Sequence, residues 1–430
     1  MLIVEYQQAK QLQQSKGESN IAKIQQNYDI VISVDAGYNG CKVTVNGVAF
    51  EIPSDIVEIT GKSNFGDIRK DGFICMKYLE GQSHLVGEQA RTLLTEKEYK
   101  SSQAAKQQML ESYDKFTMKE SEIHLMTCIG MALIKWSEYC EENGITPKFD
   151  ITKPVTEDSL FNIYIILGFP HDVYKKAYQA VKPTVVGKHN FKIETEENDY
   201  DLNFVIKSQN IMTFSQALAA FMGLVTDDNG KIDYDSEYFK HLPTLVIDGG
   251  QKTVGIYVIT ATLQIELAES NTIFAMNNVY EKVVQTIKDD YGRNDIEIYN
   301  IAEILKNNDG EIVSYNKETD QTEVIDIKPI VSQFTDETCA QLIEYIKEKY
   351  NNLLDIKQIV VAGGTGAAYY EGISKYIKGH RSNLENNVIL AQYKFMGKMI
   401  TPVQAISVGL YKVLKNQIEV QKKEANREEK

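Results

Sequence analysis

The pattern of apolar runs and turn residues predicts an α/β protein whose first structured element is a short buried strand. Residues 30–34 form an apolar run, and Asp35 and a glycine-containing turn come directly after it. A run of this length that ends in a turn is typical of a buried strand. Further strands are expected at 41–45 and 48–52, joined by an Asn-Gly pair at 46–47, which is a strong hairpin signal. We therefore expect an antiparallel meander of three strands here.

The same succession begins again in the second half of the chain. A strand is expected at 244–247, an Asp-Gly-Gly turn at 248–250 and a returning strand at 253–259. A later strand at 358–361 runs into a glycine-rich loop that opens a helix. The sequence has no short repeat period, which argues against a solenoid. The echo of strand, Asp-x-Gly turn and strand predicts two similar lobes, each with a mixed sheet flanked by helices.

Helical patterns fill much of the sequence between these strands. The longest helix is expected at 120–139 and ends near an Asn-Gly pair. An Ala-rich helix is expected at 215–225. A further helix, with Thr401 as its N-cap and Pro402 as its first residue, presents one apolar face. The other expected elements are a strand at 162–167, an exposed hairpin insertion within 305–330, mostly helical structure over 85–145, and helices at 335–350 and from the glycine loop to 377.

The length of the chain, 430 residues, is too great for one ordinary core. We expect lobe I at residues 28–215 plus 396–420 and lobe II at residues 216–395. Residues 1–27 are rich in Gln and are expected to form an extension outside the core, and residues 421–430 form a charged tail.

Composition and charge narrow the classes of function. Apolar residues make up 43% of the chain and charged residues 25%, which is typical of a globular protein. No stretch approaches the ~20 apolar residues of a membrane span, and the N-terminus has no signal-peptide pattern. We therefore expect a cytoplasmic protein that does not bind membranes. The net charge of −14 argues against direct binding of nucleic acid by the surface as a whole.

The spacing of the cysteines and histidines along the sequence does not indicate a disulfide framework, a metal site or a catalytic site. None of the five cysteines forms a C-x-x-C pair, so disulfide-scaffold and metal-site interpretations are weak, and buried free thiols are expected. The six histidines are scattered along the chain, and we expect structural roles for them.

The first Asp-x-Gly turn has the composition of a phosphate-binding hairpin. Two glycines expose successive backbone N–H groups, which can hold a phosphate chain where side chains would block its approach. Asp35 ends the preceding strand, where a carboxylate can hold Mg²⁺ through the water shell of the ion. The residues expected to contact phosphates are Gly37, Tyr38, Asn39, Gly40 and Lys42, with Tyr38 and Asn39 acting through their backbone. Taken alone, this turn is also compatible with an ordinary polar hairpin.

The second turn and the later glycine loop can bind a nucleotide for the same physical reasons as the first turn. Asp248 matches Asp35, and small residues in the loop would let a flat adenine or ribose approach the backbone. The nucleotide-binding residues expected here are Gly249, Gly250, Lys252 and Thr253 in the turn, and Gly363, Gly364, Thr365 and Gly366 in the loop. A GG-x-G loop taken alone is usually a strand–helix connector.

In their order along the chain, these three segments resemble the first phosphate, second phosphate and adenosine segments of the actin superfamily. Residues 216–218 resemble the hinge-helix segment in which actin keeps its catalytic Gln, and residues 405–411 resemble the second connecting segment. Within the superfamily, residues 86–90 and 168–170 are similar to features of the ParM-type plasmid-segregation actins. The resemblance covers roughly residues 28–415, and only the full ordered set is specific.

The resemblance implies a two-lobed actin-like ATPase fold, with duplicated ribonuclease-H-like sheets and a nucleotide cleft between the lobes. It implies ATP or ADP with Mg²⁺ as cofactors and leaves GTP open. Asp35, Asp248 and Gln216 would organise Mg²⁺ through its waters, and Gln216 would orient the attacking water. The implied function is assembly with copies of itself into nucleotide-dependent filaments, for plasmid or DNA segregation through a small DNA-binding adaptor protein.

Three rival functions belong to other classes. A small-molecule kinase of the same superfamily would need a substrate-side Asp base in lobe I, for which no convincing motif is present. A chaperone ATPase would need a peptide-binding domain, and the tail after Leu414 is too short for one. A membrane-linked cytoskeletal scaffold of the MreB or FtsA type would need an amphipathic terminal helix with bulky apolar residues, for which residues 2–6 are a meagre candidate.

Overall fold

The computed structural model describes most of the chain from Asp29 onward. The described residues are 29–37, 40–59, 69, 72–78, 81–93, 119–145, 162–307, 309–316, 321–384 and 386–428. The expected N-terminal extension, residues 1–27, lies outside them. The chain forms two compact units, which are described separately: unit 1 extends to Phe239 and resumes at Gln392, and unit 2 is Lys240–Ala391.

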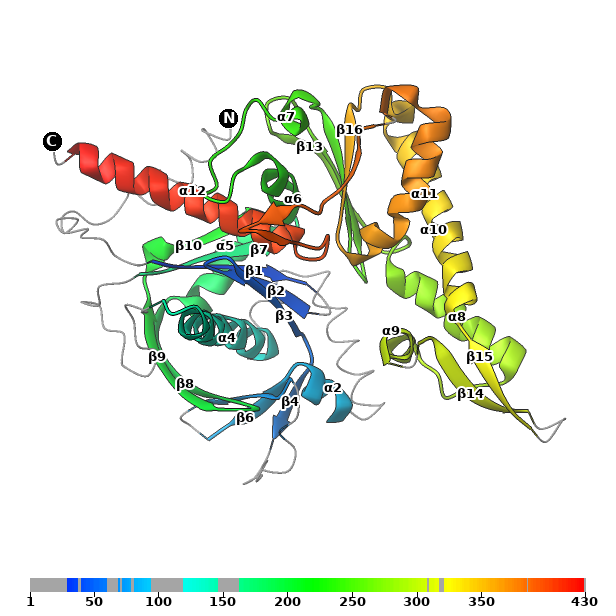
Figure 1. Cartoon of the computed structure of the whole chain (residues 1–430), viewed down its shortest axis with the longest axis horizontal. Helices are drawn as coiled ribbons and strands as arrows, with labels where there is room; N and C mark the ends of the chain where they lie inside the picture. The colour runs from blue at the N-terminus through cyan, green and yellow to red at the C-terminus, as the bar shows by residue number, and fades with distance from the viewer. Residues whose placement is uncertain are drawn as a thin grey trace. The chain divides into compact units, whose positions relative to one another are not determined.

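The main sheet of unit 1 contains the expected meander. Its strand order is β10-β7-β1-β2-β3, with β2 antiparallel to both neighbours and β7 parallel to β1 and β10 (Figure 1). The strands are β1 (Ile30–Ala36), β2 (Gly40–Val45), β3 (Val48–Pro53), β7 (Ile163–Phe169) and β10 (Ile211–Ser215). The Asn-Gly pair at 46–47 joins β2 to β3, and Gly47 has a φ of +93°, which suits a tight hairpin.

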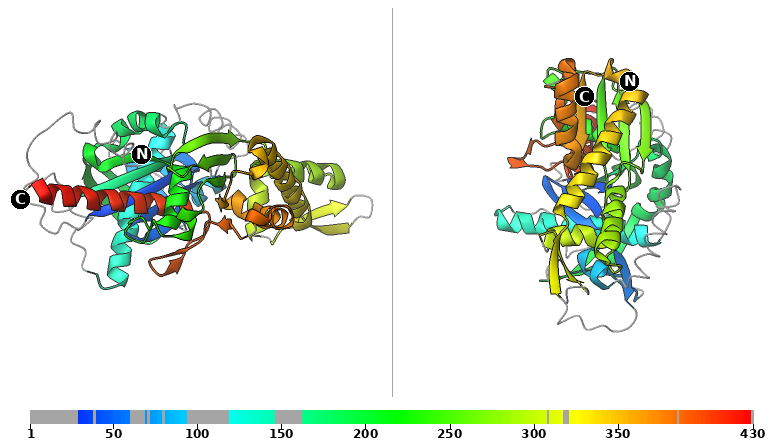
Figure 2. Two further views of the ribbon diagram at one scale, coloured as in Figure 1. Left: turned by 90° about the horizontal axis from the view of Figure 1, so that it is seen from above. Right: turned by 90° about the vertical axis from the view of Figure 1, so that its right-hand side faces the viewer.

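Helices cover both faces of this sheet, and successive side chains of each strand point alternately to the two faces. Ile30, Ile32 and Val34 of β1 join the same core as α4 and α5, whereas Ser33 bonds to α12 on the opposite face. The helices of unit 1 are α2 (Glu88–Leu93), α4 (Lys119–Glu142), α5 (Tyr174–Val185), α6 (Gln216–Val225) and α12 (Ala405–Glu428), and the short α7 (Glu237–Lys240) spans its boundary with unit 2. Figure 2 (left) shows α12 running across the sheet, with its C-terminal turns reaching beyond it.

A second sheet of unit 1 was not expected from the sequence. It is antiparallel, in the order β4-β6-β5-β8-β9, and α4 lies between it and the main sheet (Figure 1). Its strands are β4 (Ile56–Ile59), β5 (Ile74–Tyr78), β6 (Ser83–Val86), β8 (Gly187–Thr195) and β9 (Asp199–Ile206). Residues 123–134 of α4 are buried in succession because sheets cover the helix on two sides. The expectation of mostly helical structure over 85–145 is thus wrong at its start, where Leu85 and Val86 complete β6.

Unit 2 repeats the topology of the main sheet. Its order is β13-β12-β11-β16-β17, with an antiparallel meander followed by two parallel strands. The strands are β11 (Thr244–Gly249), β12 (Val254–Ile259), β13 (Ile265–Asn271), β16 (Gln358–Ala362) and β17 (Val388–Leu390). Equivalent strands therefore stand in equivalent positions in the two sheets, which confirms the echo seen in the sequence.

The helices of unit 2 surround this sheet and a separate hairpin. They are α8 (Met276–Tyr291), α9 (Ile298–Asn307), α10 (Lys328–Lys349) and α11 (Gly364–His380). The hairpin is β14 (Glu311–Asn316) with β15 (Gln321–Asp326), and it packs with α8 and α9 in a small core of its own. This confirms the expected hairpin insertion. Helix α10 begins seven residues before the expected start at 335, because Pro329 stands in its first turn and suits that position.

The compact units divide the chain at different points from the expected lobes. Helix α6 packs along α12, and Gly409 is needed where they meet, since a Cβ there would lie 1.9 Å from the carbonyl oxygen of Ala219. Residues 216–239 therefore fall in unit 1, whereas we expected lobe II to begin at 216. The charged residues 421–428, expected as a tail, continue α12. Among the helices of the described residues, none is long and apolar enough to cross a membrane.

We predict that Gly409→Ala destabilises unit 1 by about 1–3 kcal/mol, because the added methyl group forces α6 and α12 apart. The matched control is Gly379→Ala in α11, where a Cβ would meet nothing within 4 Å. That substitution should leave stability unchanged or raise it, since Ala favours helices over Gly. Urea unfolding followed by circular dichroism checks both variants, and equal midpoints for the two would contradict the close approach.

Candidate nucleotide-binding site

The carboxyl ends of three parallel strands meet at one edge of the main sheet of unit 1. In register, Asp35 of β1 pairs with Gly168 of β7, and Gly168 pairs with Phe214 of β10. The chain leaves β10 directly into α6, whose N-cap is Ser215 and whose first residue is Gln216. Edges of this kind, where parallel strands end, are where open α/β sheets bind ligands.

Asp35 and Gln216, both expected in the site, are in direct contact at this edge. The side-chain amide of Gln216 donates a hydrogen bond to Asp35 Oδ1 at 2.5 Å, and Asp35 is only 6% exposed. A buried carboxylate needs such donors, because losing water without replacement is costly. One N–H of the amide is thereby bonded to Asp35, and the amide oxygen can accept a hydrogen bond from water.

Backbone contact excludes a Cβ at Gly37, whereas a Cβ at Gly40 would mainly require the Glu51 side chain to move. A Cβ on Gly37 would lie 2.6 Å from the carbonyl oxygen of Gly40, and a Cβ on Gly40 would lie 2.8 Å from Glu51 Oε1. The backbone N–H of Gly37 donates to the carbonyl of Asp35 at 2.9 Å, which tightens the turn. Tyr38 and Asn39, expected to act through their backbone, lie outside the described residues.

Lys42 stands beside this turn, as expected, but it has a partner that the sequence analysis did not single out. Its Nζ lies 3.2 Å from Glu51 Oε1 and donates to the carbonyl oxygen of Gly40 at 3.1 Å. Burial lowers the pKa of Lys42, but Glu51 and Asp35 raise it by more, so its pKa lies above the usual value. The side chain is therefore a cation held next to the turn.

In unit 2, the second turn and the glycine loop touch each other. The Thr365 hydroxyl donates to the carbonyl oxygen of Gly250 at 2.7 Å. A Cβ on Gly249 would lie 2.1 Å from the backbone nitrogen of Gly366, so only glycine permits this approach. Gly363 has a φ of +78°, in the left-handed region that favours glycine. The structure thus brings these predicted residues together within one unit.

The remaining predicted residues of unit 2 surround the same point. Asp248 is half-buried at the end of β11, and a Cβ on Gly363 would lie 3.2 Å from its Oδ1. The N–H of Gly250 donates to the carbonyl of Thr253 at 2.9 Å and closes the turn that contains Lys252. Helix α11 begins at Gly364, so its free N–H groups face the region where the parallel strands β11 and β16 end.

The sequence analysis did not identify the buried hydroxyl groups that fix β1 and β2, the strands on either side of the first turn. The Ser33 hydroxyl donates to the carbonyl oxygen of Ser407 at 2.7 Å, and Thr44 Oγ1 donates to Ser407 Oγ at 3.2 Å. All three residues are fully buried, and together they tie β1 and β2 to the first turn of α12. The one signal in the sequence is that Ser407 interrupts an apolar helical stretch.

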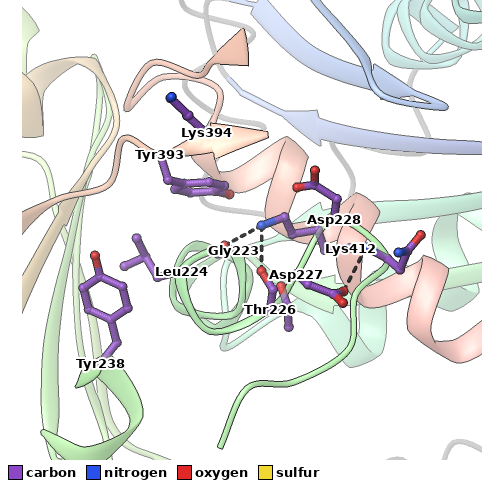
Figure 3. A pocket seen from close by; sticks show the side chains of 10 residues that line it. Gly223, Leu224, Thr226, Asp227, Asp228, Tyr238, Tyr393, Lys394 and Lys412 are labelled. Atoms are coloured by element: carbon purple, nitrogen blue, oxygen red, sulfur yellow. Dashed lines mark hydrogen bonds between the residues drawn. The ribbon is translucent and has the colours of Figure 1, made fainter. Parts of the chain in front are cut away.

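Lys412 is a buried cation that the sequence analysis overlooked. Figure 3 shows its Nζ pointing at the C-terminal end of α6, where it donates to the carbonyl oxygens of Gly223 at 2.8 Å and Thr226 at 2.9 Å. It also lies 4.4 Å from the ring centroid of Tyr393. The last carbonyls of a helix lack helical partners, so Lys412 caps α6 and couples it to α12.

Comparisons with known proteins place these observations in a wider context. No family model and no curated protein matches the sequence. Solved structures do match. The actin-like protein Alp7A is 15% identical with a TM-score of 0.63, covering 94% of this chain and 100% of that one. A 15-stranded ParM filament from Clostridium botulinum is 16% identical with a TM-score of 0.59, covering 90% and 99%. Bacillus thuringiensis ParM with ATP is 11% identical with a TM-score of 0.53, covering 91% and 99%.

At these identities the likeness shows the fold alone, and it spans nearly the whole of each chain. The chain has the actin-like fold, in its ParM-like form, and this confirms both the resemblance and the expected fold class. The assignment of individual residues to nucleotide and metal stays a prediction.

We predict that the buried Lys412 makes stability depend on alkaline pH. Burial lowers its pKa to about 8 from 10.5, against the opposing effect of Asp228 and Asp227. Because the unfolded chain then holds this proton more tightly than the folded one, folding is penalised below pH 8 and the penalty fades as pH rises towards 10.5. From pH 7 to pH 10, the stability of the wild type relative to Lys412→Met should rise by about 2 kcal/mol.

Denaturant unfolding of both proteins at the two pH values measures this difference, and other titrating groups cancel in the comparison. Lys423→Met, at an exposed position of the same helix, is the matched control and should show no such change. A pH-independent difference between wild type and Lys412→Met would mean that burial does not lower the pKa of Lys412.

Proposed function

We propose that this chain is an actin-like ATPase that assembles into nucleotide-dependent filaments. The single observation that carries the proposal is the contact between Asp35 and Gln216 at the end of three parallel strands, beside a turn in which the backbone leaves no room for a Cβ on Gly37. A carboxylate and an amide next to the cation of Lys42 are groups that phosphoryl transfer to water uses.

The described residues fit a nucleotide phosphate chain with Mg²⁺. The turn after β1 has no room for a Cβ at Gly37, as expected where backbone must approach phosphates closely. Unit 2 offers a second carboxylate turn at Asp248 and the N-terminus of α11. When bound, Mg²⁺ would supply charge neutralisation on the phosphates, and Asp35 and Asp248 would hold its water shell.

Each protein group then has a distinct task. Lys42 and the N-terminal N–H groups of α11 hold phosphate oxygens, which fixes the position of the reacting phosphorus. Gln216 orients the attacking water through its amide oxygen, while one amide N–H stays bonded to Asp35. Thr365 acts on the turn rather than on the ligand, since its hydroxyl is already bonded to Gly250. The similar ParM structure with ATP supports ATP as the nucleotide, and GTP is the alternative.

Filament formation is proposed because a similar chain, the Clostridium botulinum ParM, was solved as a filament. Unit 2 has an apolar surface that suits contact with a second copy. Val313 of β14 is 61% exposed and stands directly opposite Val324 of β15, which is 60% exposed, and Tyr315 extends the same face. Side chains of this kind rarely cluster on an exposed sheet face without a partner.

The cellular role that we propose is plasmid or DNA segregation in the cytoplasm. The net charge of −14 disfavours direct contact with DNA, so a small basic adaptor would link filament and DNA. A small-molecule kinase is the alternative within the same fold, and phosphate transfer to an acceptor other than water would identify it.

We predict that Gln216→Ala binds ATP and assembles but releases phosphate about 10–100-fold more slowly, the scale of losing a positioning group. Its filaments should therefore outlast those of the wild type after a single addition of ATP with Mg²⁺. Light scattering and phosphate release, recorded in parallel over a range of protein concentrations, measure both effects. Gln285→Ala, at an exposed position of α8, is the control and should behave as wild type.

For the wild type, phosphate release should rise steeply above a threshold protein concentration. Release that is strictly proportional to concentration, without scattering, would favour a kinase. Unchanged hydrolysis in Gln216→Ala would reduce this residue to a support for Asp35.

We also predict that Val313→Asp with Val324→Asp abolishes assembly while ATP binding is retained. Two facing carboxylates on this hairpin repel each other and prevent an apolar contact between copies. Leu354→Asp is the control, because Leu354 is an exposed apolar residue of unit 2 outside the hairpin and is 67% exposed. Sedimentation with ATP separates the outcomes, and normal pelleting of the double variant would show that the hairpin lies outside the filament contacts.

A further inference from the structure

Three side chains with metal-binding atoms meet inside unit 1, away from its surface. Cys41 stands at the start of β2, and His124 and Cys128 stand one turn apart on α4. Their ligand atoms all lie within 4.8 Å of one another, and all three residues are buried. Positions four apart share a face of a helix, and this face of α4 packs against β2, so the fold alone brings the three together.

The orientation of His124 leaves one ring nitrogen available to the cluster. Its Nε2 lies 3.1 Å from the carbonyl oxygen of Pro53, which can only accept, so Nε2 carries the proton. The Nδ1 lone pair then points towards Cys41 Sγ at 3.4 Å. An imidazole fixed through its far N–H by a backbone carbonyl is the arrangement that protein metal sites use to orient a histidine ligand.

We propose that Cys41, Cys128 and His124 bind a thiophilic cation, Zn²⁺ or Cu⁺, through two sulfurs and one imidazole nitrogen. Bonds of ~2.3 Å to sulfur and ~2.0 Å to nitrogen place the ligand atoms about 3.5–4 Å apart. The atoms here already lie within that range or close to it, so binding needs only small side-chain shifts.

The chemistry of the donors selects the cation. Thiolate and imidazole are soft or borderline ligands, which favour Zn²⁺ and Cu⁺ over Mg²⁺ or Ca²⁺. Two thiolates neutralise Zn²⁺, so the occupied site would carry no net charge into the buried interior. The cluster offers three ligands from the residues that the structure describes, a number that suits Cu⁺, whereas four-coordinate Zn²⁺ would add a fourth ligand such as water.

The position of the cluster gives it a consequence for the turn after β1. Cys41 lies between Gly40 and Lys42, and a bound cation would tie this end of β2 to α4. Occupancy would therefore stiffen the start of the returning strand. Metal binding itself does not depend on the proposed ATPase function, so the two can fail separately.

The test is titration of the reduced, metal-free protein with Co²⁺, as a coloured substitute for Zn²⁺, and in a separate arm with Cu⁺ against a chromogenic Cu⁺ chelator. We expect one equivalent per chain in one arm, with the visible bands of thiolate-bound tetrahedral Co²⁺ or with Cu⁺ withdrawn from the chelator. Cys128→Ala and His124→Gln should each weaken binding by more than about 100-fold, since losing even an outer partner costs about 10–100-fold. Cys140→Ala is the control, because Cys140 is buried on the same helix outside the cluster.

X-ray absorption of the loaded wild type keeps the proposal testable if the variants fail to fold, and it should show two sulfurs and one nitrogen at the metal. No binding in either arm would overturn the proposal. Equal binding by Cys128→Ala and Cys140→Ala, or a coordination shell without sulfur, would do the same. A Cys41–Cys128 disulfide in a protein that binds neither cation when reduced would make the pair a redox pair instead.

Discussion

A buried carboxylate at the end of β1 constrains everything around it in unit 1. Asp35 is almost excluded from water, so its charge must be met by donors from the protein. The amide of Gln216 reaches it because β10 ends at the same edge of the sheet, with β7 between β10 and β1, and α6 starts there at once. The parallel strand β7 fixes that spacing, and Gly168 leaves room for α12, since a Cβ there would lie 2.6 Å from a side-chain carbon of Leu410. The bond to Asp35 therefore depends on the strand order, on the point where α6 starts and on the packing behind the sheet.

The helices behind the sheet are joined by close backbone contact and by buried polar bonds. Gly409 allows α12 to approach Ala219 of α6, and Lys412 binds the last carbonyls of the same helix. Ser407 then connects α12 to both strands of the first hairpin. A shift of α12 would therefore displace both the hairpin and the helix that begins with Gln216. Contacts between packed elements are one means by which a change in ligand state is transmitted through a protein.

The elements that could be predicted are those whose residue pattern lies within one short segment of the sequence. Buried strands such as β1 and β11 are short, mostly apolar runs, and the glycines of the turns after them follow directly in sequence. Strand β8 was missed because polar residues alternate with Phe191 and Ile193, a weaker signal than a continuous run. The Asp35–Gln216 bond joins residues 181 positions apart, so sequence could propose each residue for the site but not their contact. The Cys41 and His124 pair, 83 positions apart, has no local spacing that would reveal a metal site.

The two units share a sheet topology but differ in the helix that starts beside the carboxylate turn. Asp35 and Asp248 occupy the same place, at the end of the strand that pairs with both the returning strand and a parallel strand. The helices that begin after the parallel strands differ between the two units. In unit 1, β10 leads directly into α6 and supplies an amide, whereas in unit 2, β16 leads through Gly363 into α11 and supplies a helix N-terminus. An amide can orient a neutral water, and a helix N-terminus attracts an anion. Duplication therefore conserves the carboxylate turn, and the chemistry is made asymmetric by the residue that starts the next helix.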